Sequence, residues 1–175
     1  MTSAPNPITE VSSVTTASDR NLDISNDTGD DSPVADLTLL AGFLLDELRM
    51  APDAELSISL VDEEAMAALH VEWMDEPGPT DVLSFPLDDL REPAPHEPPP
   101  SGVMGDVVLC PAVADRQAVV AGHDQAHELR ILLTHGVLHL LGHDHVEPEE
   151  ETVMFGRQRE LVSRYEAQLA SGAGE

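Results

Sequence analysis

Apolar residues recur along the chain with two periods, one typical of helices and one typical of strands. Between residues 37 and 48, leucines recur every three or four positions, which predicts a helix with one buried stripe. Residues 56–60 alternate between aliphatic side chains and serine, which predicts a strand with one polar face. The two periods together predict strands at 22–24, 56–60, 81–85 and 103–110, and helices at 33–48, 62–76, 111–121, 125–141 and 148–169.

Residues that favour helix ends and turns support these boundaries. Ser32 followed by Pro33 is typical of a helix N-cap with proline at the first helical position. Asp62 and the two glutamates after it suit the positive end of a second helix. Residues 91–102 contain five prolines and are predicted to form a stiff surface loop. Because the strands are few, short and interspersed with helices, we expect an α+β fold with a small mixed sheet and about five helices.

Length and composition are those of one globular domain. The chain has 175 residues, of which 41% are apolar. Residues 1–20 are rich in Ser, Thr, Pro and Asn, so we expect a disordered leader there, a domain over 21–170 and a tail over 171–175. A single cysteine, no apolar run of membrane-spanning length and no visible signal peptide lead us to expect a soluble cytoplasmic protein.

The charge balance is strongly acidic. The chain has 34 acidic residues and 8 basic residues, and its net charge is −26. All eight basic residues are arginine, and such a balance argues against an extended electrostatic contact with nucleic acid or anionic lipid. Arg157 and Arg164 are seven residues apart, so they either present one cationic helix face or pair with glutamates such as Glu150 and Glu160. The other arginines beyond the leader are Arg49, Arg91, Arg116, Arg130 and Arg159.

Three histidines near residue 140 have the spacing of metal ligands. His135 and His139 are four residues apart, so a helix places both on one face. Gly142 stands where a left-handed residue would end that helix, and the reversal can return His145 to the same point. Three histidines with an open fourth position are typical of a catalytic zinc site.

Less specific interpretations of this region remain open. The histidines can be ordinary core residues, although the spacing and the glycine favour the metal site. Asp144 either orients an imidazole or is a solvated turn residue. Glu128 either orders the histidine face of the helix or is a solvated acid of its first turn.

The spacing is shared with the metzincin peptidases, which carry a glutamate as general base directly after the first histidine. Here that position is Gly136, which cannot accept a proton. Proteolysis is therefore disfavoured.

Three segments resemble the signatures of the YbeY family in order and spacing. They are PTDVLSFP at 79–86, GDVVLC at 105–110 and HGVLHLLGHDH at 135–145, and the similarity runs from about residue 22 to 165. Members of that family are single-strand-specific metallo-endoribonucleases involved in rRNA maturation. The chain is therefore similar to a family whose substrate is RNA.

The resemblance implies a zincin-like α+β fold with a four-stranded sheet and one zinc ion per chain on His135, His139 and His145. It also implies a role in 16S rRNA 3′-end maturation and in ribosome quality control. The implied partners are single-stranded rRNA and the small ribosomal subunit, with neither DNA nor a membrane expected. Two alternatives stay open: a non-catalytic ribosome-assembly factor with a structural metal site, and a zinc hydrolase of another phosphodiester.

Four polar residues of the matching segments are candidates for catalytic or substrate contacts. They are Thr80, Asp81, Ser84 and Asp106. For each of them, a hydrogen-bonding role in a turn or at a strand end is an equal alternative, and no residue is assigned as general base.

Two positions depart from the family pattern. Members commonly have an arginine five residues before the proline of the first segment, a suspected phosphate contact, and here that residue is Met74. The residue after Gly142 is often tyrosine in the family, and here His143 stands there and can compete as a ligand.

Overall fold

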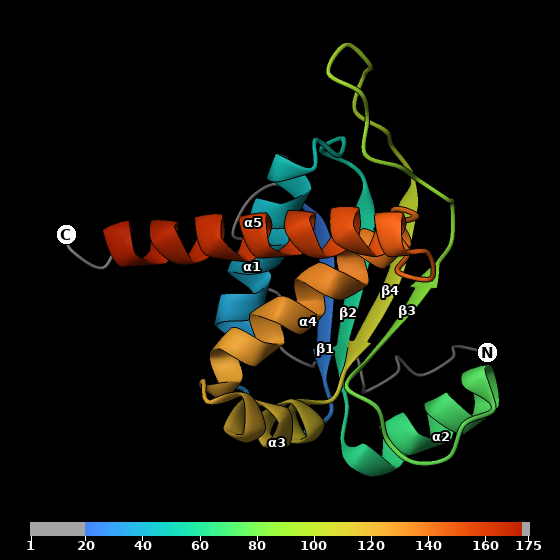
Figure 1. Ribbon diagram of the computed structural model, residues 1–175, viewed down its shortest axis with the longest axis vertical. Helices are drawn as coiled ribbons and strands as arrows, with labels where there is room; N and C mark the ends of the chain where they lie inside the picture. Colours follow the sequence, from blue (N-terminus) through green and yellow to red (C-terminus); the bar gives the residue numbers. More distant parts are fainter. Residues whose placement is uncertain (1–19, 173–175) are drawn as a thin grey trace, which may run out of the picture.

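The computed structural model describes residues 20–172 (Figure 1). Within them the chain has the predicted α+β fold, with four strands and five helices. In chain order these are β1 (Asn21–Asn26), α1 (Val34–Glu47), β2 (Glu55–Leu60), α2 (Glu63–Met74), β3 (Val82–Pro86), β4 (Val103–Leu109), α3 (Pro111–Ala121), α4 (Gln125–Leu140) and α5 (Pro148–Gly172). None of these helices is long and apolar enough to cross a membrane.

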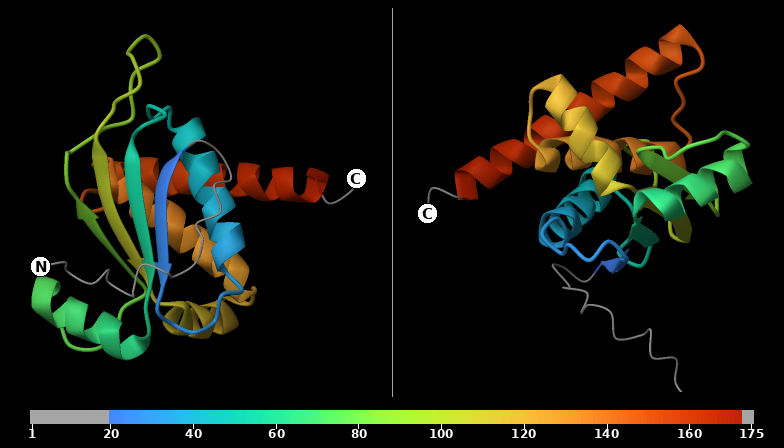
Figure 2. Two further views of the ribbon diagram at one scale, coloured as in Figure 1. Left: turned by 180° about the vertical axis from the view of Figure 1, so that it is seen from behind. Right: turned by 90° about the horizontal axis from the view of Figure 1, so that it is seen from below.

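The sheet is mixed, with strand order β1-β2-β4-β3. β1, β2 and β4 are parallel to one another, whereas β3 runs antiparallel to β4 and forms one edge of the sheet. Helices α1, α4 and α5 lie on one face of this sheet (Figures 1 and 2). A smaller cluster on the other face includes Met66 of α2 and Val108 of β4. The predicted loop of prolines connects β3 to β4, and it projects from the end of the sheet in Figure 1.

Helix α4 lies directly against the edge of the sheet at Gly136. A Cβ atom at this position would be 2.7 Å from Cγ1 of Val107 on β4 and 3.1 Å from Oγ of Ser84 on β3. The Ser84 hydroxyl donates to the carbonyl oxygen of Gly136 at 3.1 Å. This close contact at Gly136 fixes the height of α4 above the strands.

The start of the first helix differs from the prediction. Helix α1 begins at Val34, and Ser32 does not cap it with its side chain. The amide of Ser32 instead donates to Oδ1 of Asp30, and the amide of Val34 donates to the carbonyl of Asp31. This turn postpones the helix, so Pro33 takes the N-cap position that was predicted for Ser32.

The other predicted boundaries hold within a few residues. Asp62 caps α2 by accepting from the amide of Ala65, and the helix ends at Met74 because Asp75 is left-handed with φ 54°. On α2, Met66 is buried, whereas Trp73 near the end of the helix is 60% exposed. The Trp73 ring packs edge-on against Phe85, with 5.5 Å between the ring centroids.

Arg20 is the described end of the expected leader, and residues 1–19 lie outside the described residues. Its Nη1 donates to the carbonyl oxygens of Met50 and Ala51 at 3.0 and 2.8 Å, and its guanidinium pairs with Asp46. Arg20 is thus anchored to the end of α1. The expected tail is helical as far as Gly172, and residues 173–175 also lie outside the described part.

The contact at Gly136 leads to a test with a matched control. Gly136→Ala should lower the free energy of unfolding by about 1–3 kcal/mol, because the new methyl overlaps Val107. Gly156→Ala on α5 should leave stability unchanged or raise it by up to about 1 kcal/mol, since no atom lies within 4 Å of its Cβ position and alanine favours helices. Urea titration measures both, and equal effects at the two sites would contradict the proposed contact.

Candidate metal centre

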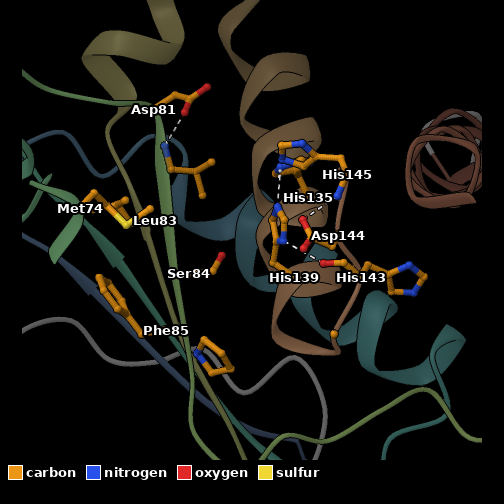
Figure 3. Close-up of a pocket in the computed structure, with 13 residues that line it drawn as sticks. Met74, Asp81, Leu83, Ser84, Phe85, His135, His139, His143, Asp144 and His145 are labelled. Atoms are coloured by element: carbon orange, nitrogen blue, oxygen red, sulfur yellow. Dashed lines mark hydrogen bonds between the residues drawn. The ribbon is translucent and has the colours of Figure 1, made fainter. Parts of the chain in front are cut away.

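Three imidazoles converge at the C-terminal end of α4 (Figure 3). His135 and His139 lie one turn apart on the helix, with 3.1 Å between their Nε2 atoms. His145 comes from the following loop, and one ring nitrogen from each of the three lies within 4.8 Å of the others. The spacing argument thus identified the three residues that the fold brings together.

The backbone after α4 reverses as the glycine predicts. Gly142 is left-handed with φ 89°, and its amide donates to the carbonyl of His139 at 3.0 Å. The amide of His143 donates to the carbonyl of Leu138, also at 3.0 Å. This C-terminal hydrogen bonding turns the chain back over the last helical turn and returns His145 to the helix.

Hydrogen bonds at Nδ1 determine which nitrogen faces the centre. Nδ1 of His135 lies 2.8 Å from Oε1 of Gln158, and Nδ1 of His139 lies 2.9 Å from the carbonyl oxygen of His143. Both partners are acceptors, so each Nδ1 carries the proton and donates it. The Nε2 lone pairs are therefore left to face one another, as metal ligation requires.

The surroundings also favour neutral imidazoles. Burial lowers the pKa of His135 and of His139, and the neighbouring His135 lowers the pKa of His139 further. The ring of Phe155 stacks on His135 at 5.9 Å between centroids and is 6.0 Å from His145. Because a metal ion binds the deprotonated nitrogen, this environment fits a divalent cation with nitrogen ligands, zinc among them.

A cavity of about 500 Å³ opens beside the three histidines. One wall is the edge strand β3 with the residue before it, and the other is the loop after α4. Two of the candidate polar residues, Asp81 and Ser84, line this cavity, as does Met74 (Figure 3). The centre is thus accessible to a ligand from outside.

Thr80 and Asp106 are placed differently. Thr80 donates its hydroxyl to Oδ1 of Asp81 at 3.3 Å and is not among the residues that line the cavity. Asp106 lines a second cavity of about 700 Å³, together with Trp73 and Phe85. Its neighbour Val107 faces α4, and since side chains alternate along a strand, Asp106 points to the other face of the sheet. Asp106 therefore does not line the metal cavity.

The remaining candidates near the centre have structural partners. The ring of His143 points away from the other three histidines (Figure 3), and its surroundings include Glu92 and Arg157. Oδ1 of Asp144 accepts from the amide of His145 at 2.7 Å, so it holds the loop rather than an imidazole. Glu128 pairs with His123 at 2.6 Å.

Gln158 and Phe155 were not found from the sequence. They lie on α5, and Gln158 is 23 residues beyond His135. One sequence signal could have indicated Gln158: it is a polar residue within the apolar stripe of α5. In the structure it is only 8% exposed. A buried amide needs a partner, and here that partner is the imidazole of His135.

The hydrogen bond from His135 to Gln158 leads to a prediction about metal affinity. Gln158→Ala should weaken Zn²⁺ binding by about 10- to 100-fold, because the ring loses the acceptor that fixes its tautomer. Gln158→Glu keeps an acceptor and should retain most of the affinity, whereas Gln168→Ala, on the exposed side of the same helix, should change nothing. Competition with a chromophoric chelator measures all three, and full affinity in Gln158→Ala would refute the positioning role.

Comparison with known proteins agrees with this geometry. The sequence model of the family described as Endoribonuclease YbeY matches residues 24–166. The chain is 54% identical to an Endoribonuclease YbeY of Leifsonia xyli over 85% of its own length and 99% of that protein. It is 53% identical to one of Thermobifida fusca, over 85% and 96% of the two chains.

A solved structure supports the fold. The solution structure of TM1509 from Thermotoga maritima superimposes with a TM-score of 0.61 at 24% identity, covering 86% of this chain and 93% of that one. This likeness concerns the fold, while the family match covers the three histidines. The chain therefore belongs to the Endoribonuclease YbeY family.

Proposed function

We propose that this protein is a zinc-dependent endoribonuclease that cleaves single-stranded RNA at the three-histidine centre. The observation that carries the proposal is the convergence of His135, His139 and His145 beside an accessible cavity. Family membership supplies the reaction class, which is hydrolysis of RNA within the strand.

His135 and His139 would hold one zinc ion through Nε2, and His145 would add one of its ring nitrogens. A zinc ion there supplies Lewis-acid chemistry, offsetting the charge that develops on the reacting phosphate. Gln158 and the carbonyl of His143 keep two of the ligand rings neutral and aimed. The Asp81 carboxylate accepts from the amide of Val82 at 2.7 Å, and Ser84 donates to Gly136, so both are held in place at the cavity wall.

The shape of the centre favours a flexible strand over a duplex. Two of the three histidines are half-buried, and the ion would lie between β3 and the loop after α4 that carries His145, called the histidine loop below. A single strand can bend a phosphodiester into such a recess, whereas a duplex presents its phosphates on a stiff, broad helix. We therefore propose a single strand as the substrate, and the endoribonuclease family supports RNA and not DNA as its chemistry.

The biological role proposed here rests on the family. The substrate would be 16S rRNA near its 3′ end, with the small ribosomal subunit as partner and ribosome quality control as a second role. A cytoplasmic location goes with that substrate. The chain's relatives are described as endoribonucleases, and this description supports RNA as the substrate.

A non-catalytic assembly factor with a structural metal site is the other candidate. Structural zinc sites in proteins have four protein ligands, typically rich in cysteine. Among residues 20–172 the group of possible ligands contains three histidines and no fourth residue. An open coordination position favours the enzyme.

A cleavage assay with matched histidine variants tests the proposal. His139→Ala should reduce cleavage of a single-stranded 16S rRNA 3′ fragment by at least about 100-fold, because it removes a ligand of the ion. His96→Ala, in the exposed loop between β3 and β4, removes an imidazole far from the centre and should keep full activity.

The substrate arms of the same assay separate the alternatives. Parallel reactions contain the matching duplex RNA, a DNA strand of the same sequence and bis(p-nitrophenyl) phosphate. Preferred cleavage of the small diester would favour a zinc hydrolase of another phosphodiester. If the zinc-loaded wild type cuts none of these substrates, the proposed activity is wrong.

A further inference from the structure

The metal cavity has no cationic side chain among its lining residues. Asp81 and Asp144 contribute carboxylates, and the rest of the lining is apolar, hydroxyl-bearing or imidazole. Met74 contributes a neutral thioether at the cavity wall. An RNA strand carries one negative charge for each phosphate, and the protein itself has a net charge of −26. Each cationic side chain beside the mouth of this cavity therefore contributes more to RNA binding than it would in a basic protein.

Most arginines are already committed to partners inside the protein. Five form ion pairs with carboxylates: Arg20, Arg116, Arg130, Arg157 and Arg164. Arg157 and Arg164 both pair with Glu160, so the internal pairing considered for these two is confirmed. Arg49 donates to the carbonyl oxygens of Ala94 and Glu97.

Arg91 differs from these in both its partners and its position. It is exposed in the loop after β3, and within residues 20–172 it forms neither an ion pair nor a side-chain hydrogen bond. Its guanidinium lies against Gly142, so closely that a Cβ atom there would collide with Nη1. Gly142 in turn lines the metal cavity. The guanidinium of Arg91 thus lies beside the rim of the centre, and no acceptor within residues 20–172 bonds to it.

We propose that Arg91 binds a backbone phosphate of the RNA strand that flanks the one at the metal centre. This inference rests on the proposed function and names a substrate-positioning residue for it. A guanidinium presents parallel N–H donors that match two oxygens of one phosphate, and it stays charged at any physiological pH. The guanidinium of Arg91 occupies space that a side chain at position 142 would fill, so glycine is needed there.

The neighbouring arginines are less suited to this role. Arg157 is near His143, but Glu92 at 2.6 Å and Glu160 at 3.0 Å already neutralise it. Arg159 also has no ion pair among the described residues, yet no contact places it against a residue of the cavity. Arg91 alone combines, within the described residues, an uncommitted guanidinium with a contact to the cavity lining.

Binding of RNA to an inactive parent protein tests the proposal. The parent is the full chain with His145→Ala, since His145 is exposed in a loop and its loss should stop cleavage without disturbing the core. A fluorescein-labelled single-stranded 16S rRNA 3′ fragment is titrated at several salt concentrations. Arg91→Gln in this parent should weaken binding about fivefold and make the slope of log affinity against log salt shallower by about 0.7.

Two further variants control for charge and chemistry. Arg116→Gln removes the same charge from α3, which precedes the N-terminal end of α4, whereas the histidine loop follows its C-terminal end. It should leave affinity and slope unchanged. Arg91→Lys retains the charge without the planar fork, so its slope should match that of the parent while its affinity is intermediate.

The outcomes separate this inference from the proposed function. Equal affinity and slope in Arg91→Gln and Arg116→Gln would overturn the role of Arg91 while leaving an RNA-binding protein. A lower melting temperature in Arg91→Gln with unchanged RNA affinity would show that the arginine only caps the end of α4, and would also overturn it. If neither this parent nor the zinc-loaded wild type binds the RNA fragment, the proposed function is overturned, and the inference with it.

Discussion

The position of helix α4 against the sheet edge is the constraint on which the site depends. At Gly136 no side chain separates the helix from Val107 and Ser84, and Ser84 bonds to the helix backbone. His135 is the preceding residue and His139 follows one turn later, so the height and rotation of the helix set where both imidazoles point. Gly136 stands where the metzincin peptidases carry their glutamate base. Because it has no side chain, the same glycine allows α4 to lie this close to the sheet.

Contacts from α5 and from the loop after α4 orient the histidine rings that α4 positions. Helix α5 crosses over α4 and brings Gln158 and Phe155 to His135, while the reversed loop brings the carbonyl of His143 to His139. The rings of His135 and His139 are thus each held by a partner from a different segment. Metal binding would therefore tie α4, α5 and their connecting loop together, and part of its free energy would contribute to the stability of the fold.

Sequence patterns predicted the features that depend on residues close together in the chain. They did not predict contacts between segments that are far apart in the chain. The convergence of the three histidines, the left-handed Gly142 and the start of α2 after Asp62 follow from spacings of a few residues, and the structure shows each of them. The face to which Asp106 points depends on the register between β3 and β4, which sequence alone did not supply. The pairing of Arg157 with Glu92 and the contact of Arg91 with Gly142 likewise join loops and helices that are far apart in the chain.

The central claim is that one divalent ion binds to Nε2 of His135 and His139 and to a ring nitrogen of His145, and keeps an open coordination position. Crystals of the zinc-loaded protein, with anomalous data collected on both sides of the zinc absorption edge, test it most directly. The account predicts one anomalous peak per chain, about 2.0–2.1 Å from Nε2 of His135 and of His139 and from one ring nitrogen of His145, with no fourth protein ligand. A peak ligated by His143, or one closed by a fourth side chain, would contradict it.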